Sequence, residues 1–245
     1  MNNIKRKTMK TIAQLLLVCI TFLLVNPSKA SVICNEINDR KTITKPFTNI
    51  DIDGAFTVIL NQGDTESVFI ESENSMMPYI NSSVKNNTLK ITLKTGLGTK
   101  TIKEIKLHIT VKNLKSLKLS GFIDLETSKQ INFTELNLNC SGAVNVKLNS
   151  RSKSLICNVS SLSEIFLLGN TDNLDIIKTD ASTVNAFQLK ANNVSIRSLG
   201  FGEVNVSAIN TLNITSNGPT SIKYKGNPSK TAFDIKGLST LKKLK

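Results

Sequence analysis

The sequence predicts an all-β protein, a parallel β-solenoid (β-helix) with coils of about 19 residues. Three observations support this class. The repeat has a nearly constant length, apolar residues alternate within each repeat, and one fixed position of each repeat carries a residue that tolerates tight or left-handed backbone. Two short strands and a corner cannot bury an apolar face alone, whereas stacked coils share one continuous core. A β-sandwich is the structural alternative, but its turns would not normally place the same residue types at the same position of every repeat.

The repeat is clearest at one position of each coil, which we call the anchor. Anchors separated by 21, 19, 19, 20, 18 and 19 residues are Ser120, Ser141, Ser160, Thr179, Leu199, Asn217 and Lys236. Directly after each anchor comes a residue that tolerates tight or left-handed backbone, namely Gly121, Gly142, Ser161, Asp180, Gly200, Gly218 or Gly237. Apolar residues precede the anchor by three and five positions and follow it by five. This period of two indicates strands that face one interior, since helical repeats would need a period of 3.6.

Residues 1–30 have the features of a secretory signal peptide. Basic residues precede an apolar run from Ile12 to Val25, and Pro27–Ala30 offers a cleavage site of small residues. The run is shorter than the roughly 20 residues that span a bilayer, so we expect no membrane span after cleavage. Cys19 lies in a poor lipid-attachment motif because Val18 replaces the expected small residue. Cleavage lowers the net charge from +13 to +8, with 26 Lys and Arg against 18 Asp and Glu.

After the signal peptide we expect a lead-in at residues 31–46 and a single solenoid domain at 47–245. Within that domain, 47–113 should form broader, irregular coils that include antiparallel pairing, and 114–245 should form regular coils. The first coil begins near the mature N-terminus, because Asp53 and Gly54 fit the anchor and corner positions. Solenoid ends expose edge strands, and the Lys-rich tail from Lys242 is a plausible electrostatic guard against edge-to-edge association.

Several segments resemble a known family: Phe47–Val58, Leu89–Ile91, the Ser-Gly corner in Cys140–Ala143, and Ile222–Pro228. Over about residues 47–245 the chain resembles the putative auto-transporter adhesin, head GIN domain family. The resemblance implies a right-handed β-solenoid and an exported protein, mostly of Bacteroidetes-type bacteria. It implies no catalytic residue set. The sequence departs from the family pattern where Ser-Gly corners are degraded, for instance at Ser160-Ser161.

The composition disfavours metal, haem and triad chemistry. The chain contains one His and no Trp, so chemistries that need one or several dedicated imidazoles have little material. We therefore expect no catalytic, metal-binding or cofactor-binding residues, and no enzyme. His108 lies opposite Ile105, Leu107 and Ile109 and should face solvent. Nucleic acid is not an expected partner, because no basic stripe is interleaved with stacking aromatics.

The cysteines of the mature chain are Cys34, Cys140 and Cys157. Cys140 and Cys157 belong to neighbouring coils and fall on inward positions, and an exported protein meets an oxidising environment. Coil stacking and a two-residue offset place their Cα atoms roughly 8 Å apart, beyond the usual disulfide reach. We expect two buried thiols, with a Cys140–Cys157 bridge as the alternative.

Outward positions offer the remaining candidate chemistry. A polar column four residues after the anchors contains Asp124, Asn145, Glu164, Thr183, Glu203 and Ser221. Carboxylates on alternate coils lie about 10 Å apart, too far for a shared calcium ion or a retaining glycosidase pair. A carbohydrate-active enzyme would have to combine Glu164 with Arg197 or Lys118. Sugar platforms are conceivable at exposed aromatic residues, but ordinary corner packing explains them as well; these residues are Phe122, Phe166 and Phe201. Abundant Asn residues should form ladder and turn hydrogen bonds.

The expected function is noncovalent, adhesin-like binding of surface or polysaccharide ligands by an exported cell-envelope protein. The partner would be an envelope or extracellular polysaccharide or a host surface component. The alternative is a periplasmic structural or envelope-stress protein, and a carbohydrate-active enzyme is less favoured. The ligand, its binding residues, the oligomeric state and the choice between periplasm and cell surface stay open at this stage.

Overall fold

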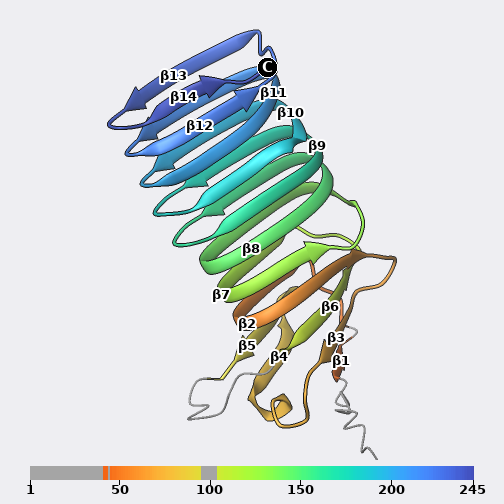
Figure 1. The fold of residues 1–245 in the computed structure, drawn as a ribbon. Coiled ribbons are helices and arrows are strands. Elements are labelled where there is room, and N and C mark those ends of the chain that lie inside the picture. The colour runs from red at the N-terminus through yellow and green to blue at the C-terminus, as the bar shows by residue number, and fades with distance from the viewer. Residues whose placement is uncertain (1–40, 44, 95–103) are drawn as a thin grey trace, which may run out of the picture. The chain divides into compact units, whose positions relative to one another are not determined.

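The computed structural model describes residues 41–43, 45–94 and 104–245. They lie within one compact unit that extends from Glu36 to Lys245. The regular structure of these residues consists of strands and one short 3₁₀ helix, η1 (Met77–Tyr79). The strands stack as coils of a parallel β-solenoid, which confirms the predicted all-β class (Figure 1).

The first part of the described chain combines parallel and antiparallel pairing. Its strands are β1 (Lys41–Ile43), β2 (Asn49–Gln62), β3 (Ser67–Glu71), β4 (Ile80–Lys85), β5 (Thr88–Leu93) and β6 (Lys106–Val111). β1 pairs with β3, β3 with β6 and β4 with β5, all antiparallel. β2 runs parallel to β5 and β6. The antiparallel pairing predicted for this part is therefore present.

The second part is a regular stack of parallel coils. Its strands are β7 (Ser116–Thr127), β8 (Ile131–Val159), β9 (Glu164–Lys178), β10 (Thr183–Leu199), β11 (Gly202–Asn217), β12 (Thr220–Lys225), β13 (Lys230–Lys236) and β14 (Thr240–Lys243). The parallel order is β2-β7-β8-β9-β10-β11-β12-β14, and β13 pairs with β11. The long strands bend round the coil and pair with their neighbours along most of their length (Figure 1).

The register reproduces the repeat found in the sequence. Asp53 lies beside Ser120, and Ser120 lies beside Ser141, so anchors stack on anchors. The corner glycines Gly54 and Gly121 are aligned in the same way. The first coil thus stacks directly on β7, although more than fifty residues separate β2 from β7 in the sequence.

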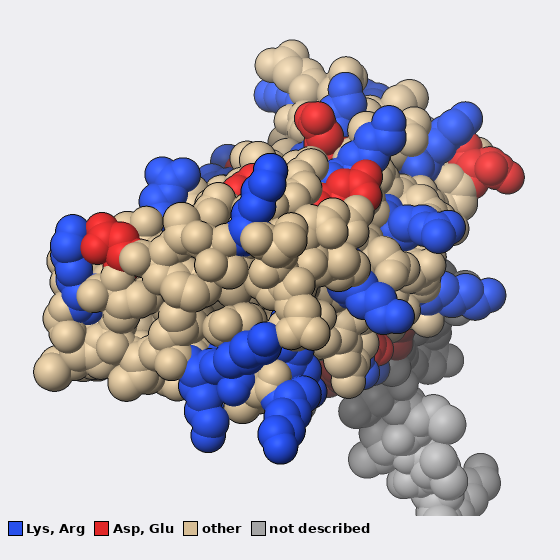
Figure 2. Space-filling model, turned by 90° about the horizontal axis from the view of Figure 1, so that it is seen from above, with Lys and Arg blue, Asp and Glu red and all other residues tan. Residues whose placement is uncertain are grey.

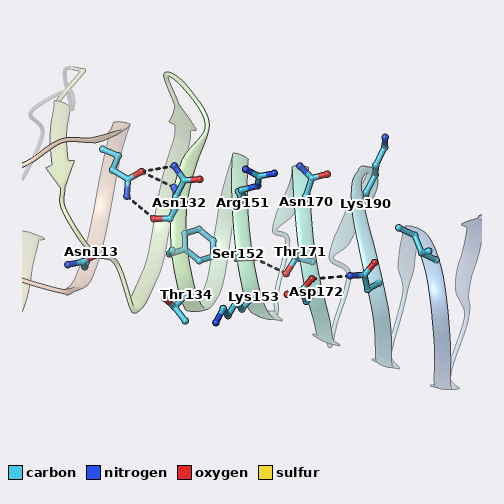
Figure 3. Close-up of a pocket in the computed structure, with 14 residues that line it drawn as sticks. Asn113, Asn132, Thr134, Arg151, Ser152, Lys153, Asn170, Thr171, Asp172 and Lys190 are labelled. Carbon is cyan, nitrogen blue, oxygen red and sulfur yellow. Dashed lines mark hydrogen bonds between the residues drawn. The ribbon is translucent and has the colours of Figure 1, made fainter.

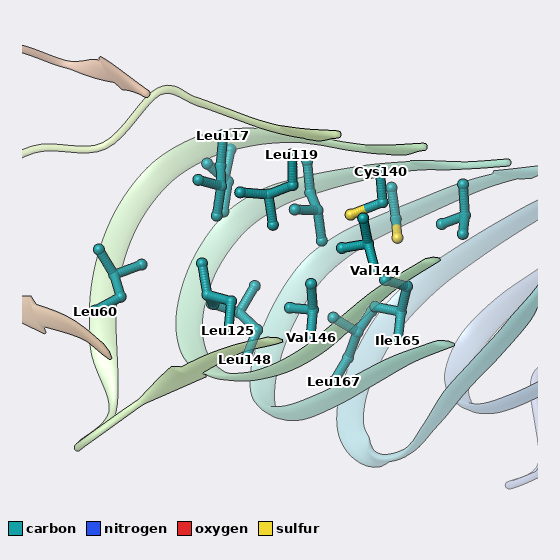
Figure 4. Close-up of a cluster of buried hydrophobic side chains, with 14 of the residues drawn as sticks. Leu60, Leu117, Leu119, Leu125, Cys140, Val144, Val146, Leu148, Ile165 and Leu167 are labelled. Atoms are coloured by element: carbon teal, nitrogen blue, oxygen red, sulfur yellow. The ribbon is translucent and has the colours of Figure 1, made fainter. Parts of the chain in front are cut away.

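Alternating side chains from successive coils meet in one core, and Figure 4 shows part of it in β2, β7, β8 and β9. The column three residues before the anchor is almost completely buried in the central coils, and its members are Leu117, Leu138, Cys157, Ile176, Ile196 and Ile214. Full burial of one such aliphatic side chain contributes about 1.5–3 kcal/mol. The period predicts burial for Phe233 too, because it lies three residues before the anchor Lys236, but it is 43% exposed. β13 pairs with β11 on one side, and no further coil of the described residues packs against its other side. Its inward-facing side chains therefore stay partly exposed to solvent.

Two kinds of corner follow the anchors. At Gly121 and Gly142 the strand continues through the corner with φ near +100° (99° and 103°). At Ser161 and Asp180, φ is 63° and 56°, so non-glycine residues adopt the left-handed conformation. Hydroxyl groups support these tighter corners: the Ser163 Oγ donates hydrogen bonds to the carbonyls of Gly142 and Ser160. Where the Ser-Gly pair is replaced, the chain therefore turns through a left-handed non-glycine residue supported by hydroxyl hydrogen bonds, and the coils still stack.

Some sequence predictions fall outside the described residues. These are the signal peptide at 1–30, Cys34 and most of the lead-in at 31–46. Within the described part of the chain, no helix is long and apolar enough to cross a membrane.

Candidate functional site

A groove of about 750 Å³ crosses four successive coils in β8, β9 and β10. Its walls are two rows of long polar side chains (Figure 3). One row contains Asn132, Arg151, Asn170 and Lys190, and the other contains Thr134, Lys153, Asp172 and Asn192. The parallel register places Arg151 beside Asn170 and Asn170 beside Lys190. Each coil therefore contributes one residue to this row. We call this feature the basic groove.

The floor of the basic groove is made of short, buried side chains. Ser152 and Thr171 lie in register, and the Ser152 Oγ donates a hydrogen bond of 2.8 Å to the Thr171 Oγ1. Thr171 in turn donates to the carbonyl of Asn173 at 3.0 Å. Ala191 continues this floor in the next coil and is fully buried. Because inward-facing residues alternate with outward-facing ones along each strand, the two outward rows stand on either side of the buried residues and leave a channel between them.

One end of the basic groove is held in place by Gln62 from β2. Its Nε2 donates to the carbonyl of Asn132 at 2.7 Å, and its Oε1 accepts from the Asn132 backbone N–H at 2.8 Å. Two backbone groups at the start of β8 are thereby satisfied by a side chain seventy residues earlier. Near the other end stands Ile209, which is 47% exposed.

The charge of the basic groove is positive. Its lining includes Arg151, Lys153 and Lys190, against one carboxylate, Asp172. The Asp172 Oδ1 accepts a hydrogen bond of 2.9 Å from Asn192, so this carboxylate is already engaged. Lys and Arg also outnumber Asp and Glu on the face shown in Figure 2. The groove can therefore attract an anion and offer amides and hydroxyls for additional hydrogen bonds.

The structure separates the residues of the enzyme alternative. Glu164 lies between Asn145 and Thr183 in the polar column after the corner. Arg197 lies before its anchor, between Ile177 and Thr215. Lys118 is far along the stack and pairs with Asp51 at 3.6 Å. These charged groups stand on strand segments that a corner separates, and the register does not bring them together.

The other candidates have structural partners. His108 faces outward as expected, but it is only partly exposed because its Nε2 lies 3.2 Å from the Glu71 carboxylate and its ring packs on Phe69. The predicted Asn ladder is present, since the Asn158 amide donates to both Asn137 and Asn139. Among the described residues, no group of three or more His, Cys, Asp or Glu is arranged to hold a metal ion.

The three candidate aromatics are exposed, the two corner residues most of all. Phe122 is 73% exposed, Phe201 64% and Phe166 39%. Sequence reasoning identified these three residues, but it identified none of the lining of the basic groove. The available signal was the pair of cations that flank Ser152, at Arg151 and Lys153, with Lys190 two coils later.

Comparison with known proteins agrees with this architecture. Residues 46–228 match the family model described as "Putative auto-transporter adhesin, head GIN domain". A putative adhesin from Bacteroides fragilis superposes with a TM-score of 0.79 at 22% identity, covering 84% of this chain and 96% of the other. A putative adhesin from Parabacteroides merdae gives 0.62 at 20% identity with the same coverage.

A third solved structure has a different name. It is a putative lipid binding protein from Parabacteroides distasonis, with a TM-score of 0.64 at 24% identity, covering 84% of this chain and 96% of that one. At such identities, these structures establish similarity of fold alone. Comparison with curated proteins gives no match. Because the family model spans most of the described coils, the chain belongs to the putative auto-transporter adhesin, head GIN domain family.

Proposed function

We propose that this protein is exported to the cell envelope and there binds an acidic polysaccharide noncovalently, as an adhesin. The observation that carries the proposal is the basic groove, in which three cations stand in two rows on either side of a buried floor. Membership of an adhesin-named family supports the general role. The signal-peptide pattern at residues 1–30 supports export.

The groove geometry favours a polymer over a small anion. Its two rows repeat once per coil, at the strand spacing of about 4.8 Å, so an extended chain lying in it meets the same chemistry at regular intervals. Arg151 and Lys190 are two coils apart in one row, a separation of about 10 Å. Acidic sugars at intervals along a chain would meet both cations, while their hydroxyls meet the Asn170 amide between them.

The same geometry favours binding over cleavage. Hydrolysis of a glycosidic bond by a pair of acids needs two carboxyl groups that face each other across the scissile bond. The basic groove contains Asp172 alone, and Asn192 occupies one of its oxygens. The groove therefore holds a sugar chain without supplying the second carboxyl group of such a pair.

Binding can be tested with polygalacturonate, a polymer of uronic acid, and with dextran as a neutral polymer. We expect polygalacturonate to bind and its affinity to fall with salt, because surface charges are screened within about 10 Å at 0.1 M. The double variant Arg151→Gln/Lys190→Gln should bind about tenfold more weakly in isothermal titration calorimetry.

The matched control is Lys147→Gln/Arg197→Gln, which removes two exposed cations away from the groove. This control should bind polygalacturonate like the wild type. Equal loss in both double variants would reduce the interaction to net charge and contradict a role of the groove.

The location is tested separately, by protease shaving of intact cells with a periplasmic marker as control. Release of peptides from residues 31–245 is the expected result for a surface adhesin. Protection until the outer membrane is permeabilised would instead favour the periplasmic structural alternative.

A further inference from the structure

A second surface runs along the corner that follows the anchors. Two residues after each anchor, every coil carries an apolar residue, and we call this column the corner ridge. Its members in coil order are Ala55, Phe122, Ala143, Leu162, Ala181, Phe201, Pro219 and Leu238. The register aligns Ala55 with Phe122 and Phe122 with Ala143. Corner hydrogen bonds from Leu162 to Gly142 and from Phe201 to Asp180 continue the alignment.

The large members of the corner ridge project into solvent. Phe122 is 73% exposed, Leu162 70%, Phe201 64% and Leu238 80%, among the highest exposures of large apolar side chains in the described residues. They alternate strictly with the small members, so one large side chain projects every two coils, about 10 Å apart. A contiguous row of exposed apolar side chains indicates an interaction surface.

Two copies of the corner ridge are complementary to each other when one copy runs in the opposite direction. A two-fold axis between the coils of Leu162 and Ala181 places Leu162 of one copy opposite Ala181 of the other. The same axis then pairs every large residue with a small one: Ala55 with Leu238, Phe122 with Pro219, and Ala143 with Phe201. Each projecting side chain meets a gap, and both copies use the same patch, as an isologous interface requires.

The polar column beside the ridge is compatible with the same axis. Asp124, Glu164 and Glu203 alternate with Asn145, Thr183 and Ser221 along the stack. Reversal places Asp124 opposite Ser221, Asn145 opposite Glu203 and Glu164 opposite Thr183. Each carboxylate thus faces a neutral residue and none faces another carboxylate, so the flank adds no like-charge repulsion.

We propose that the corner ridge is the interface of an antiparallel homodimer, in which a second copy of this chain covers the exposed Phe and Leu side chains. The ridge and the basic groove share no residues, so the proposal is independent of the ligand. In the dimer, two grooves are held at a fixed separation, which increases the avidity for a polymer that reaches both.

Self-association is tested by sedimentation equilibrium of the wild-type protein over a wide concentration range. We expect a monomer–dimer equilibrium that Leu162→Glu/Phe201→Glu weakens at least about a hundredfold, because charges then replace buried apolar contacts. The matched control Ile156→Glu/Ile209→Glu also replaces two exposed apolar residues, but outside the ridge, and should dimerise like the wild type.

A second variant separates specific pairing from general stickiness. Ala181→Phe adds apolar surface but fills the gap opposite Leu162, so it should weaken the dimer. Stronger association of Ala181→Phe would contradict the pairing of large with small residues. A wild-type protein that stays monomeric overturns the proposal. This holds even if the monomer binds another partner, such as phosphatidylcholine vesicles or dextran.

The direction of the two copies is tested by disulfide trapping in a chain with Cys19 and Cys34 replaced by Ser. A mixture of Ala143→Cys and Phe201→Cys molecules should form the mixed disulfide. Neither variant alone should link to itself, because identical residues lie three coils apart along the antiparallel dimer, about 14 Å. Self-linked Ala143→Cys would show parallel copies and overturn the antiparallel arrangement.

Discussion

At the residue scale, Cys140 and Cys157 are both buried and both carry free thiols. Burial raises the pKa of Cys157 to about 12. The pKa of Cys140 is raised as well, mainly by burial and further by the neighbouring Cys157. The thiolate is the reactive form of cysteine, so both groups are inert in the folded protein although they share one core.

We therefore predict that iodoacetamide modifies neither Cys140 nor Cys157 in the native protein near pH 8, where the unperturbed thiol already ionises in part. Both should react fully after unfolding in guanidinium chloride. Peptide mass spectrometry distinguishes them from Cys34, the other cysteine of the mature chain. Rapid native alkylation, or recovery of the two as a disulfide, would contradict the buried free thiols.

Lys178 is the largest polar side chain in the core, and it is fully buried. Its Nζ donates hydrogen bonds to the carbonyls of Asp180 and Phe201, which belong to two neighbouring corners. Loss of hydration lowers the pKa of this ammonium below 10.5, and the nearby Asp180 carboxylate offsets part of that effect. The cation therefore ties two corners together at a cost in solvation.

This lowered pKa predicts a pH dependence of stability. Between the folded pKa and 10.5, the unfolded chain binds one more proton at Lys178 than the folded chain does, so the free energy of unfolding rises with pH. Relative to Lys178→Met, the wild type should gain stability as the pH rises toward 10.5, as measured by urea denaturation. A difference that is constant over this range would contradict the lowered pKa.

At the scale of the element, the corners decide how closely coils can stack. A Cβ added at Gly142 would lie 2.5 Å from the carbonyl oxygen of Gly121, and φ there is +103°. Both the contact and the dihedral angle exclude larger residues unless the coils move apart. At Ser161 the chain is also left-handed, but a non-glycine residue is accommodated.

These differences predict opposite sensitivities. Gly142→Ala should lower the free energy of unfolding by about 3 kcal/mol, because strain and a backbone clash add. Ser161→Gly should change it by less than about 1 kcal/mol, because relief of the left-handed conformation and the greater entropy of unfolded glycine oppose each other. Urea denaturation of both variants measures the contrast, and similar losses would contradict it.

At the scale of the whole molecule, the periodic part of the structure was the predictable part. Every coil must present apolar residues to one core, so the anchors, the buried columns and the parallel stacking were present in the sequence as a period. Antiparallel pairing near β3 and β4 was predictable only as a departure from that period. The exposure of Phe233 was not predicted, because a repeat does not show which coil lacks a neighbour.

The surfaces proposed for binding were harder to predict because outward residues are not constrained by the core. The basic groove lies where coil lengths vary, and the pairing of β10 with β11 shifts register between Ala186 and Lys190. Columns counted forward from the preceding anchor therefore drift by up to two positions, whereas Arg151, Asn170 and Lys190 each lie nine residues before the following anchor. The sequence places Phe122, Leu162, Phe201 and Leu238 at one position of the coil, but a repeat alone does not show that these side chains are exposed.

The alternation along the corner ridge also limits how the solenoid can grow. Reversal matches large with small residues only when the number of coils in the ridge is even. Duplication of one coil would place Phe and Leu side chains against each other across the two-fold axis, whereas duplication of an adjacent pair would restore the match. Lineages that retain the dimer should therefore gain or lose coils two at a time.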